Sequence, residues 1–209
     1  MASKTRARRA RFTGIAVSAA LLAAVLPAAA SAACPEAELS QPFKQFGDSS
    51  YYQLAQGGSF EGSTAGWVFQ SGLLGLAQQS VSVGSGNESY NLVPGSHSLS
   101  IGANGMAVSP WVCISSEFPT WRFVARKTGG ASSAPLNVSL RWINLLGVGV
   151  ESGAGSLTSA GSWAPSPVMK LGDSVPLWLP GGTAMVQLVF HSGAGAWSVD
   201  DVYLDPYRR

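Results

Sequence analysis

Residues 197–204 read Trp-Ser-Val-Asp-Asp-Val-Tyr-Leu, and this stretch carries the clearest structural signal in the sequence. Strict alternation along a β-strand would place Trp197 and Val199 on the face opposite to Val202 and Leu204. One extra residue at the Asp-Asp pair, a β-bulge, brings all four apolar side chains to one core face. We therefore predict a bulged core strand near the end of the chain, with a carboxylate turned toward the edge of the sandwich.

Runs with the same alternation occur before this strand. The segment 136–142 places four apolar residues on one face and three polar residues on the other, as is typical of a half-buried strand. Similar runs occupy 97–101, 120–126, 184–190 and 196–204, with weaker ones at 67–70, 145–150, 156–158 and 168–171. Glycine accounts for 25 residues and only 11% of the chain is charged. These features predict an all-β fold, an antiparallel jelly-roll β-sandwich of roughly nine strands in a single domain.

The first 33 residues have the composition of an export signal. Five Lys or Arg residues precede an apolar run at 14–26, and small residues follow up to Ala33. This order predicts a signal peptide at 1–33 that is cleaved, and a secreted protein with no transmembrane segment in its mature chain.

The mature chain is long enough for one domain with one core. We expect its first part, 34–55, to form an N-terminal strap with Phe43 and Phe46 docked on the sandwich. The jelly-roll domain is expected to occupy 56–209.

Loss of the signal reverses the net charge. The whole sequence has 13 basic and 11 acidic residues, and five of the basic residues but none of the acidic ones lie within 1–33. Eight basic and eleven acidic residues remain, which is a net charge of −3. No run of Lys or Arg is left to follow a phosphate backbone, so the sequence predicts no nucleic-acid partner.

The mature chain keeps two cysteines, Cys34 and Cys113. An even number of cysteines in an exported chain is typical of disulfides, so we predict a bridge that ties the N-terminus to the middle of the domain. Closing so long a loop stabilises a fold by roughly 4 kcal/mol in the chain-entropy model. The alternative is a cell-surface lipoprotein with a lipid on Cys34, although Ser31 stands where such signals favour leucine.

Two motifs near the ends of the mature chain resemble those of one group of domains. Gly-Gly-Ser-Phe-Glu at 57–61, followed by Gly66-Trp67, and the stretch at 197–204 are similar to the opening and closing strands of secreted jelly-roll domains. These galactose-binding-like domains include many carbohydrate-binding modules. The segments 121–126 and 201–206 are similar to parts of exported, mostly uncharacterised actinobacterial proteins. The resemblance implies a glycan or another cell-envelope partner.

The resemblance also implies a structural calcium ion. In the domains that the chain resembles, an acid at the end of the first motif and an acid in the last strand hold calcium together with backbone carbonyl oxygens. Glu61, Asp200 and Asp201 stand at these positions. Gly58 replaces an asparagine that is frequent in the first motif, which removes one side-chain ligand. No other cofactor is expected.

Seven tryptophans suggest a sugar site, because an aromatic ring stacks on the apolar face of a pyranose. Those in strand patterns are expected in the core: Trp67, Trp142 and Trp197. Three others lie beside prolines or in loop-like surroundings and are the candidates for an exposed ligand-binding platform: Trp111, Trp163 and Trp178.

No catalytic set is recognisable in the sequence. The two histidines, His97 and His191, lie in no Ser-His-acid or metal-binding pattern. We therefore expect a secreted, non-catalytic binding domain for a polysaccharide or a cell-wall glycan. The alternative is a cell-surface structural or adhesion protein that acts through protein contacts and has no sugar site.

Overall fold

A computed structural model describes residues 34, 38–71, 81–115, 120–144, 146–158, 161–170 and 183–205. The signal peptide predicted at 1–33 lies outside these residues. Within them the chain forms thirteen β-strands and one short 3-10 helix, η1 (Lys44–Phe46). The prediction of an all-β fold is confirmed, with more strands than the sequence indicated.

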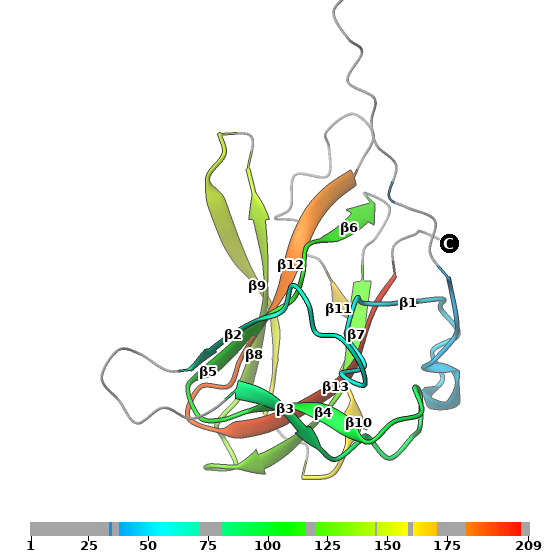
Figure 1. Ribbon diagram of the computed structural model, residues 1–209, viewed down its shortest axis with the longest axis vertical. Coiled ribbons are helices and arrows are strands. Elements are labelled where there is room, and N and C mark those ends of the chain that lie inside the picture. The colour runs from blue at the N-terminus through cyan, green and yellow to red at the C-terminus, as the bar shows by residue number, and fades with distance from the viewer. Residues whose placement is uncertain are drawn as a thin grey trace, which may run out of the picture. The chain divides into compact units, whose positions relative to one another are not determined.

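The strands form two antiparallel sheets that pack face to face (Figure 1). The seven-stranded sheet has the order β10 (Ala164–Pro165), β7 (Thr120–Gly129), β13 (Ala196–Asp205), β4 (His97–Ile101) and β3 (Val81–Ser85), with β1 (Gln53–Leu54) on β13 and β11 (Met169–Lys170) on β7. The six-stranded sheet has the order β2 (Val68–Ser71), β5 (Gly105–Val108), β12 (Thr183–His191), β8 (Leu136–Ile143) and β9 (Gly149–Leu157), with β6 (Val112–Ser115) on β12.

The main core lies between the two sheets and is built from side chains that alternate inward along the strands. Val186, Leu188 and Phe190 of β12 are buried there, as are Trp121 and Phe123 of β7. The rings of Phe123 and Phe190 join the two sheets edge to face, with 5.1 Å between their centroids. Full burial of one such side chain stabilises the fold by about 2–3 kcal/mol.

The β-bulge predicted in the last strand is present in β13. The register with β7 shifts between Asp200 and Tyr203, and Asp201 has a φ of 49°, in the left-handed region. The four apolar side chains of the motif are all buried in the core: Trp197, Val199, Val202 and Leu204. Both aspartates of the bulge are buried, and they lie between the part of β13 that pairs with β4 and the part that pairs with β1.

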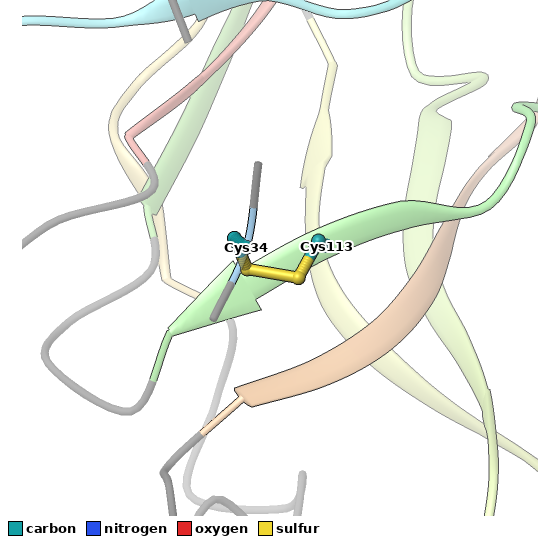
Figure 2. Close-up of a disulfide and its surroundings, with 2 residues drawn as sticks. All are labelled: Cys34 and Cys113. Carbon is teal, nitrogen blue, oxygen red and sulfur yellow. A yellow bond between two sulfur atoms is a disulfide. The ribbon is translucent and has the colours of Figure 1, made fainter. Parts of the chain in front are cut away.

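The predicted disulfide joins Cys34 to Cys113 of β6 (Figure 2). Val112 and Ile114 pack inward, so alternation turns Cys113 to the outer face of the six-stranded sheet. Because the sulfur of Cys34 is bonded to Cys113, it is not available for the lipid of the alternative prediction. Among the described residues, no helix has the length and hydropathy needed to cross a membrane.

The segment 38–54 packs on the outer face of the seven-stranded sheet. Phe43 is fully buried there, and its ring centroid lies 5.3 Å from that of Tyr52 and 5.7 Å from that of Tyr203. Phe46 packs against the same cluster. The segment therefore builds a second, smaller apolar core on the side of β13 that faces away from the main core.

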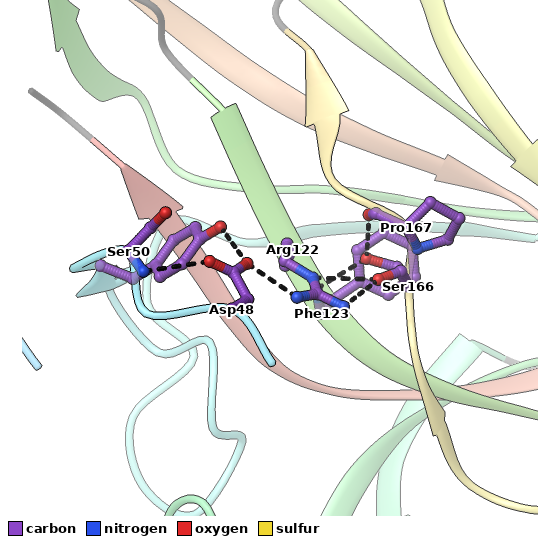
Figure 3. Close-up of polar contacts among 7 residues, drawn as sticks. Asp48, Ser50, Arg122, Phe123, Ser166 and Pro167 are labelled. Atoms are coloured by element: carbon purple, nitrogen blue, oxygen red, sulfur yellow. Dashed lines mark hydrogen bonds and ion pairs between the residues drawn. The ribbon is translucent and has the colours of Figure 1, made fainter. Parts of the chain in front are cut away.

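A polar clamp fixes this segment to the sheet (Figure 3). Asp48 accepts a hydrogen bond from the hydroxyl of Tyr52 (2.8 Å) and pairs with Nη1 of Arg122 on β7 (2.7 Å). Arg122 also donates from Nε and Nη2 to the carbonyl oxygen of Ser166. Burial raises the pKa of Asp48, but hydrogen bonds from Tyr52, Arg122 and Ser50 outweigh it and bring the pKa below its usual value of 3.8. The clamp therefore stays charged at neutral pH.

Candidate functional site

The outer face of the six-stranded sheet carries a row of polar side chains across three strands. Val186 and Leu188 of β12 point into the core, so Gln187 between them faces outward. Gln187 is paired in register with Arg141 of β8, and Arg141 is paired with Glu151 of β9. Side chains at paired positions lie on the same face of a sheet, so these three polar groups stand next to one another.

Arg141 and Glu151 form a partly exposed ion pair within this row. Arg141 Nη2 lies 2.9 Å from Glu151 Oε2, and the Ser139 hydroxyl donates to Glu151 Oε1 at 2.6 Å. Burial raises the pKa of Glu151, but the hydrogen bonds from Ser139 and Arg141 and the charges of Arg141 and His191 lower it overall. The charges of the pair cancel, so the row offers hydrogen-bonding groups without a net charge.

Trp111, a predicted platform residue, lies beside this row. It directly precedes β6, and because Val112 packs against the core, alternation turns Trp111 to the outer face, where it is 42% exposed. Val112 pairs with Val186, which places Trp111 next to Gln187. Met185, 50% exposed, adds apolar surface. The group is called the six-stranded face below: Trp111, Met185, Gln187, Arg141 and Glu151.

The other two predicted platform residues do not join this face. Trp163 is 7% exposed and lies on the outer side of the other sheet, where the guanidinium of Arg126 is 4.8 Å from its ring centroid. A ring this buried offers no platform for a ligand. Trp178 lies outside the described residues.

Glu61, predicted as a calcium ligand, binds the start of β4. Its Oε1 accepts hydrogen bonds from the amides of Ser96 and His97, and its Oε2 lies 3.1 Å from His97 Nδ1. Gly95 permits this approach, since a Cβ there would lie 2.1 Å from Glu61 Cδ. Burial raises the pKa of Glu61, but the hydrogen bonds from His97 and Ser96 outweigh it and lower the pKa.

Asp200 and Asp201 lie with Glu88, which the sequence did not indicate as a site residue. Asp200 accepts hydrogen bonds from the amides of Glu88 (3.1 Å) and Asp201 (2.9 Å), and Asp201 accepts one from Val93 (3.2 Å). Glu88 is 4% exposed and accepts a hydrogen bond from the amide of Leu92 (2.6 Å). The loop between β3 and β4 is thus held over β13 by carboxylates.

Burial has a large effect on the acidity of this cluster. It raises the pKa of Asp200 to about 7, although the amides of Glu88 and Asp201 oppose the shift. Burial and the charge of Asp200 raise the pKa of Asp201 to about 8. Asp201 Oδ1 is buried and accepts no hydrogen bond from a donor group of the described residues, and the neighbouring side chain of Glu88 raises the pKa of Asp201 further. A buried carboxylate oxygen without a donor favours a bound proton or a nearby cation.

The cluster fits a calcium ion in part. Carboxylate oxygens are the ligands that calcium prefers, and Asp201 Oδ1 has no other partner. Both oxygens of Glu61, in contrast, are taken by Ser96 and His97. Among the described residues, no group of three or more His, Cys, Asp or Glu side chains is arranged as a ready metal site.

No protein-family model and no curated protein matches the chain. Several solved structures do. The chain is similar to the enzymatically active domain of tailspike protein 4 from bacteriophage CBA120, with a TM-score of 0.51 and 15% identity. The match covers 73% of this chain and 21% of that one.

Two structures with family 22 carbohydrate-binding modules (CBM22) are equally similar. The CBM22-1 and GH10 modules of endo-1,4-beta-D-xylanase 10B from Clostridium thermocellum, complexed with xylohexaose, match with a TM-score of 0.51 and 14% identity over 75% of this chain and 28% of that one. The CBM22-1-CBM22-2 tandem domain of Xyn10C from Paenibacillus barcinonensis matches with a TM-score of 0.51 and 15% identity over 72% and 44%. The chain spans less than half the length of each of these three chains. What it shares with them is the jelly-roll β-sandwich fold.

Proposed function

We propose that the chain is a secreted, non-catalytic domain that binds a polysaccharide or a cell-wall glycan on the six-stranded face. One observation carries the proposal: the exposed ring of Trp111 lies beside a row of planar polar side chains on an open sheet face. An aromatic ring stacks on a pyranose, and Gln, Arg and Glu side chains hydrogen-bond to its hydroxyls. The fold shared with carbohydrate-binding modules supports the proposal, although fold does not determine function.

The charge and the extent of the face favour a neutral glycan. Arg141 and Glu151 compensate each other, so neither a uronate nor an amino sugar gains an unpaired partner there. From Trp111 to Glu151 the row crosses three strand spacings, which is roughly 14 Å. That length suits a short stretch of an extended polysaccharide.

The test is a calorimetric titration of the mature domain with neutral oligosaccharides such as xylohexaose and cellohexaose. Trp111→Ala is expected to weaken binding at least tenfold, whereas Trp111→Phe keeps an aromatic face and retains most of the affinity. Lys170→Gln, on the other sheet, serves as the control and binds like the natural chain. If Trp111→Ala bound glycan as tightly as the natural chain, the glycan site would not be on the six-stranded face. If the natural chain bound none of the glycans, the proposed function would be overturned.

A specific observation favours a second candidate, a surface protein that acts through protein contacts. The tip of the β8–β9 hairpin exposes apolar side chains: Ile143 (53%), Leu146 (86%) and Val148 (55%). Asn144 Oδ1 orders this tip by accepting hydrogen bonds from the amides of Leu146 (2.9 Å) and Val148 (3.0 Å). Ordered apolar surface is typical of contact sites. If the protein acts in this way, Leu146→Ser is expected to abolish its attachment to cells and to leave the glycan titration unchanged. Attachment of the Leu146→Ser variant to cells would rule out this second candidate.

We also propose that a structural calcium ion binds beside Asp200 and Asp201. Glu88 is not counted as a ligand, because its two carboxylate oxygens accept hydrogen bonds from the amides of Tyr90 and Leu92. The buried, unpartnered Asp201 Oδ1 supports this. A cation there would stabilise the charged form of carboxylates that burial disfavours, as their raised pKa values indicate. Glu61 is placed outside this ligand set because its oxygens bind Ser96 and His97.

A further inference from the structure

The outer face of the seven-stranded sheet carries a second polar row. Ser82 of β3 is paired with Ser100 of β4, Ser100 with Ser198 of β13, and Ser198 with Arg126 of β7. These strands lie side by side in Figure 1. Their flanking apolar residues point into the main core, so the three serines and the arginine share the outer face. This row is on the opposite sheet from the six-stranded face.

Arg126 differs from the other arginine on the same face of β7. Arg122 uses Nε, Nη1 and Nη2 in hydrogen bonds to Ser166 and Asp48. Arg126 makes no hydrogen bond or ion pair with any described residue, and its Nε is buried. Among the described residues, one guanidinium is therefore fully hydrogen-bonded, whereas the other has no hydrogen-bond partner. A buried donor without a partner requires an explanation such as a bound ligand.

The position of Arg126 is fixed even though its donors are unused. Its guanidinium carbon lies 4.8 Å from the ring centroid of Trp163. Gly86 packs on the same group, since a Cβ at Gly86 would lie 3.2 Å from Arg126 Nη2. Such stacking lowers the entropy lost when a ligand binds the guanidinium.

Ser198 is paired in register with Arg126 on the neighbouring strand. It is 5% exposed, and its hydroxyl makes no hydrogen bond with a described residue. Ser100, the next in the row, likewise has no partner for its hydroxyl in the described part of the chain. Ser100, Ser198 and Arg126 thus lie in register on three neighbouring strands and offer two hydroxyl donors and a five-donor guanidinium on one face. Within the described ranges no carboxylate forms an ion pair with Arg126.

We propose that Arg126, Ser198 and Ser100 form a binding site for an oxyanion group. The guanidinium matches two oxygens of a carboxylate, sulfate or phosphate, and the hydroxyls donate to the remaining oxygens. The site does not depend on the proposed glycan function. It would let the domain recognise an acidic substituent on one sheet and a neutral sugar on the other.

The test is a titration of the isotope-labelled mature domain with inorganic sulfate, inorganic phosphate and glucuronate at constant ionic strength. NMR follows the amides of Ser100 and Ser198 and the Nε of Arg126. We expect saturable shifts with at least one probe, and the preferred probe separates a tetrahedral anion from a carboxylate. Arg126→Gln is expected to weaken binding at least tenfold, and Lys170→Gln, which loses the same charge elsewhere, to leave it unchanged.

A second variant covers the case in which Arg126→Gln loosens the fold. Ser198→Ala combined with Ser100→Ala keeps the arginine on Trp163 and is expected to weaken binding severalfold. The proposal would be overturned if none of the three probes gave saturable shifts. It would also be overturned if the shifts were saturable but neither variant reduced them. Binding of xylohexaose by Arg126→Gln is expected to equal that of the natural chain, so failure of the two proposals can be told apart.

Discussion

Asp201 is the residue whose protonation bears most directly on the stability of this fold. Its pKa is raised to about 8 and that of Asp200 to about 7, against a usual value of 3.8. An acid with a raised pKa stabilises the folded state while it is protonated, and this stabilisation is lost as the pH rises from about 4 through about 8. In EDTA we therefore expect the thermal midpoint to fall over that range. Added calcium is expected to raise the midpoint more at the alkaline end, where protons no longer compete.

Two variants separate the possible ligands in this experiment. Asp201→Asn removes the charge at nearly constant shape, so it should flatten the pH dependence and remove the response to calcium. Glu61→Gln should keep the response, because Glu61 binds Ser96 and His97 instead. A calcium effect lost in Glu61→Gln but kept in Asp201→Asn would contradict the ligand set proposed above.

The segment 38–54 is the element whose attachment depends most on one side chain. Phe43 is fully buried between Tyr52, Tyr203 and the guanidinium of Arg122. Phe43→Ala is expected to lower the free energy of unfolding by about 3–5 kcal/mol, measured by urea denaturation. Phe46→Ala, at a partly exposed position, should cost clearly less. Equal losses would mean that the segment does not pack as the structure shows.

The strands that the sequence indicated are those in which apolar and polar residues alternate clearly. The run at 97–101 coincides with β4, and 120–126 and 184–190 lie within β7 and β12. Among the strands missed are β3, β5 and β6, in which a glycine (Gly84 or Gly105) or an uninterrupted apolar run (112–114) obscures the alternation. The bulge in β13 was predictable from residues 197–204 alone. Strict alternation would have placed two of the four apolar side chains on the face opposite to the core, and one extra residue brings all four to the same face.

The candidate site was less predictable than the fold. Trp111 was identified by its neighbouring proline and is exposed, whereas Trp163 has similar surroundings in sequence and is buried beneath Arg126. Glu88 was missed because its contact with Asp200 spans 112 residues and follows no local pattern. Clusters of side chains from distant loops form only when the chain packs into its tertiary structure. The periodicity of a single sequence predicts strands, but it does not predict which loops meet.

The disulfide links two parts of the molecule that are far apart in sequence, Cys34 ahead of the segment 38–54 and Cys113 on β6. Cys34 and Cys113 are 79 residues apart, and the loop that they close constrains the unfolded chain. Cys34→Ser with Cys113→Ser is expected to lower the free energy of unfolding by roughly 4 kcal/mol, while the far-UV circular dichroism stays that of a folded β protein. The measurement is urea denaturation of the variant beside the oxidised natural chain. An unchanged midpoint would show that the bridge does not constrain the denatured state.

The same bridge also determines how the domain responds to mechanical force. A pull on the chain ahead of Cys34 is transmitted through the sulfur atoms directly to Cys113 on β6. Residues between the two cysteines, which include the segment 38–54 and strands β1 to β5, then bear no load. Stretching by the two ends therefore extends only the chain beyond Cys113. Tension ahead of Cys34 does not act on the segment 38–54 through its backbone, so Phe43 leaves the sheet only when β13, which carries Tyr203, is itself pulled away.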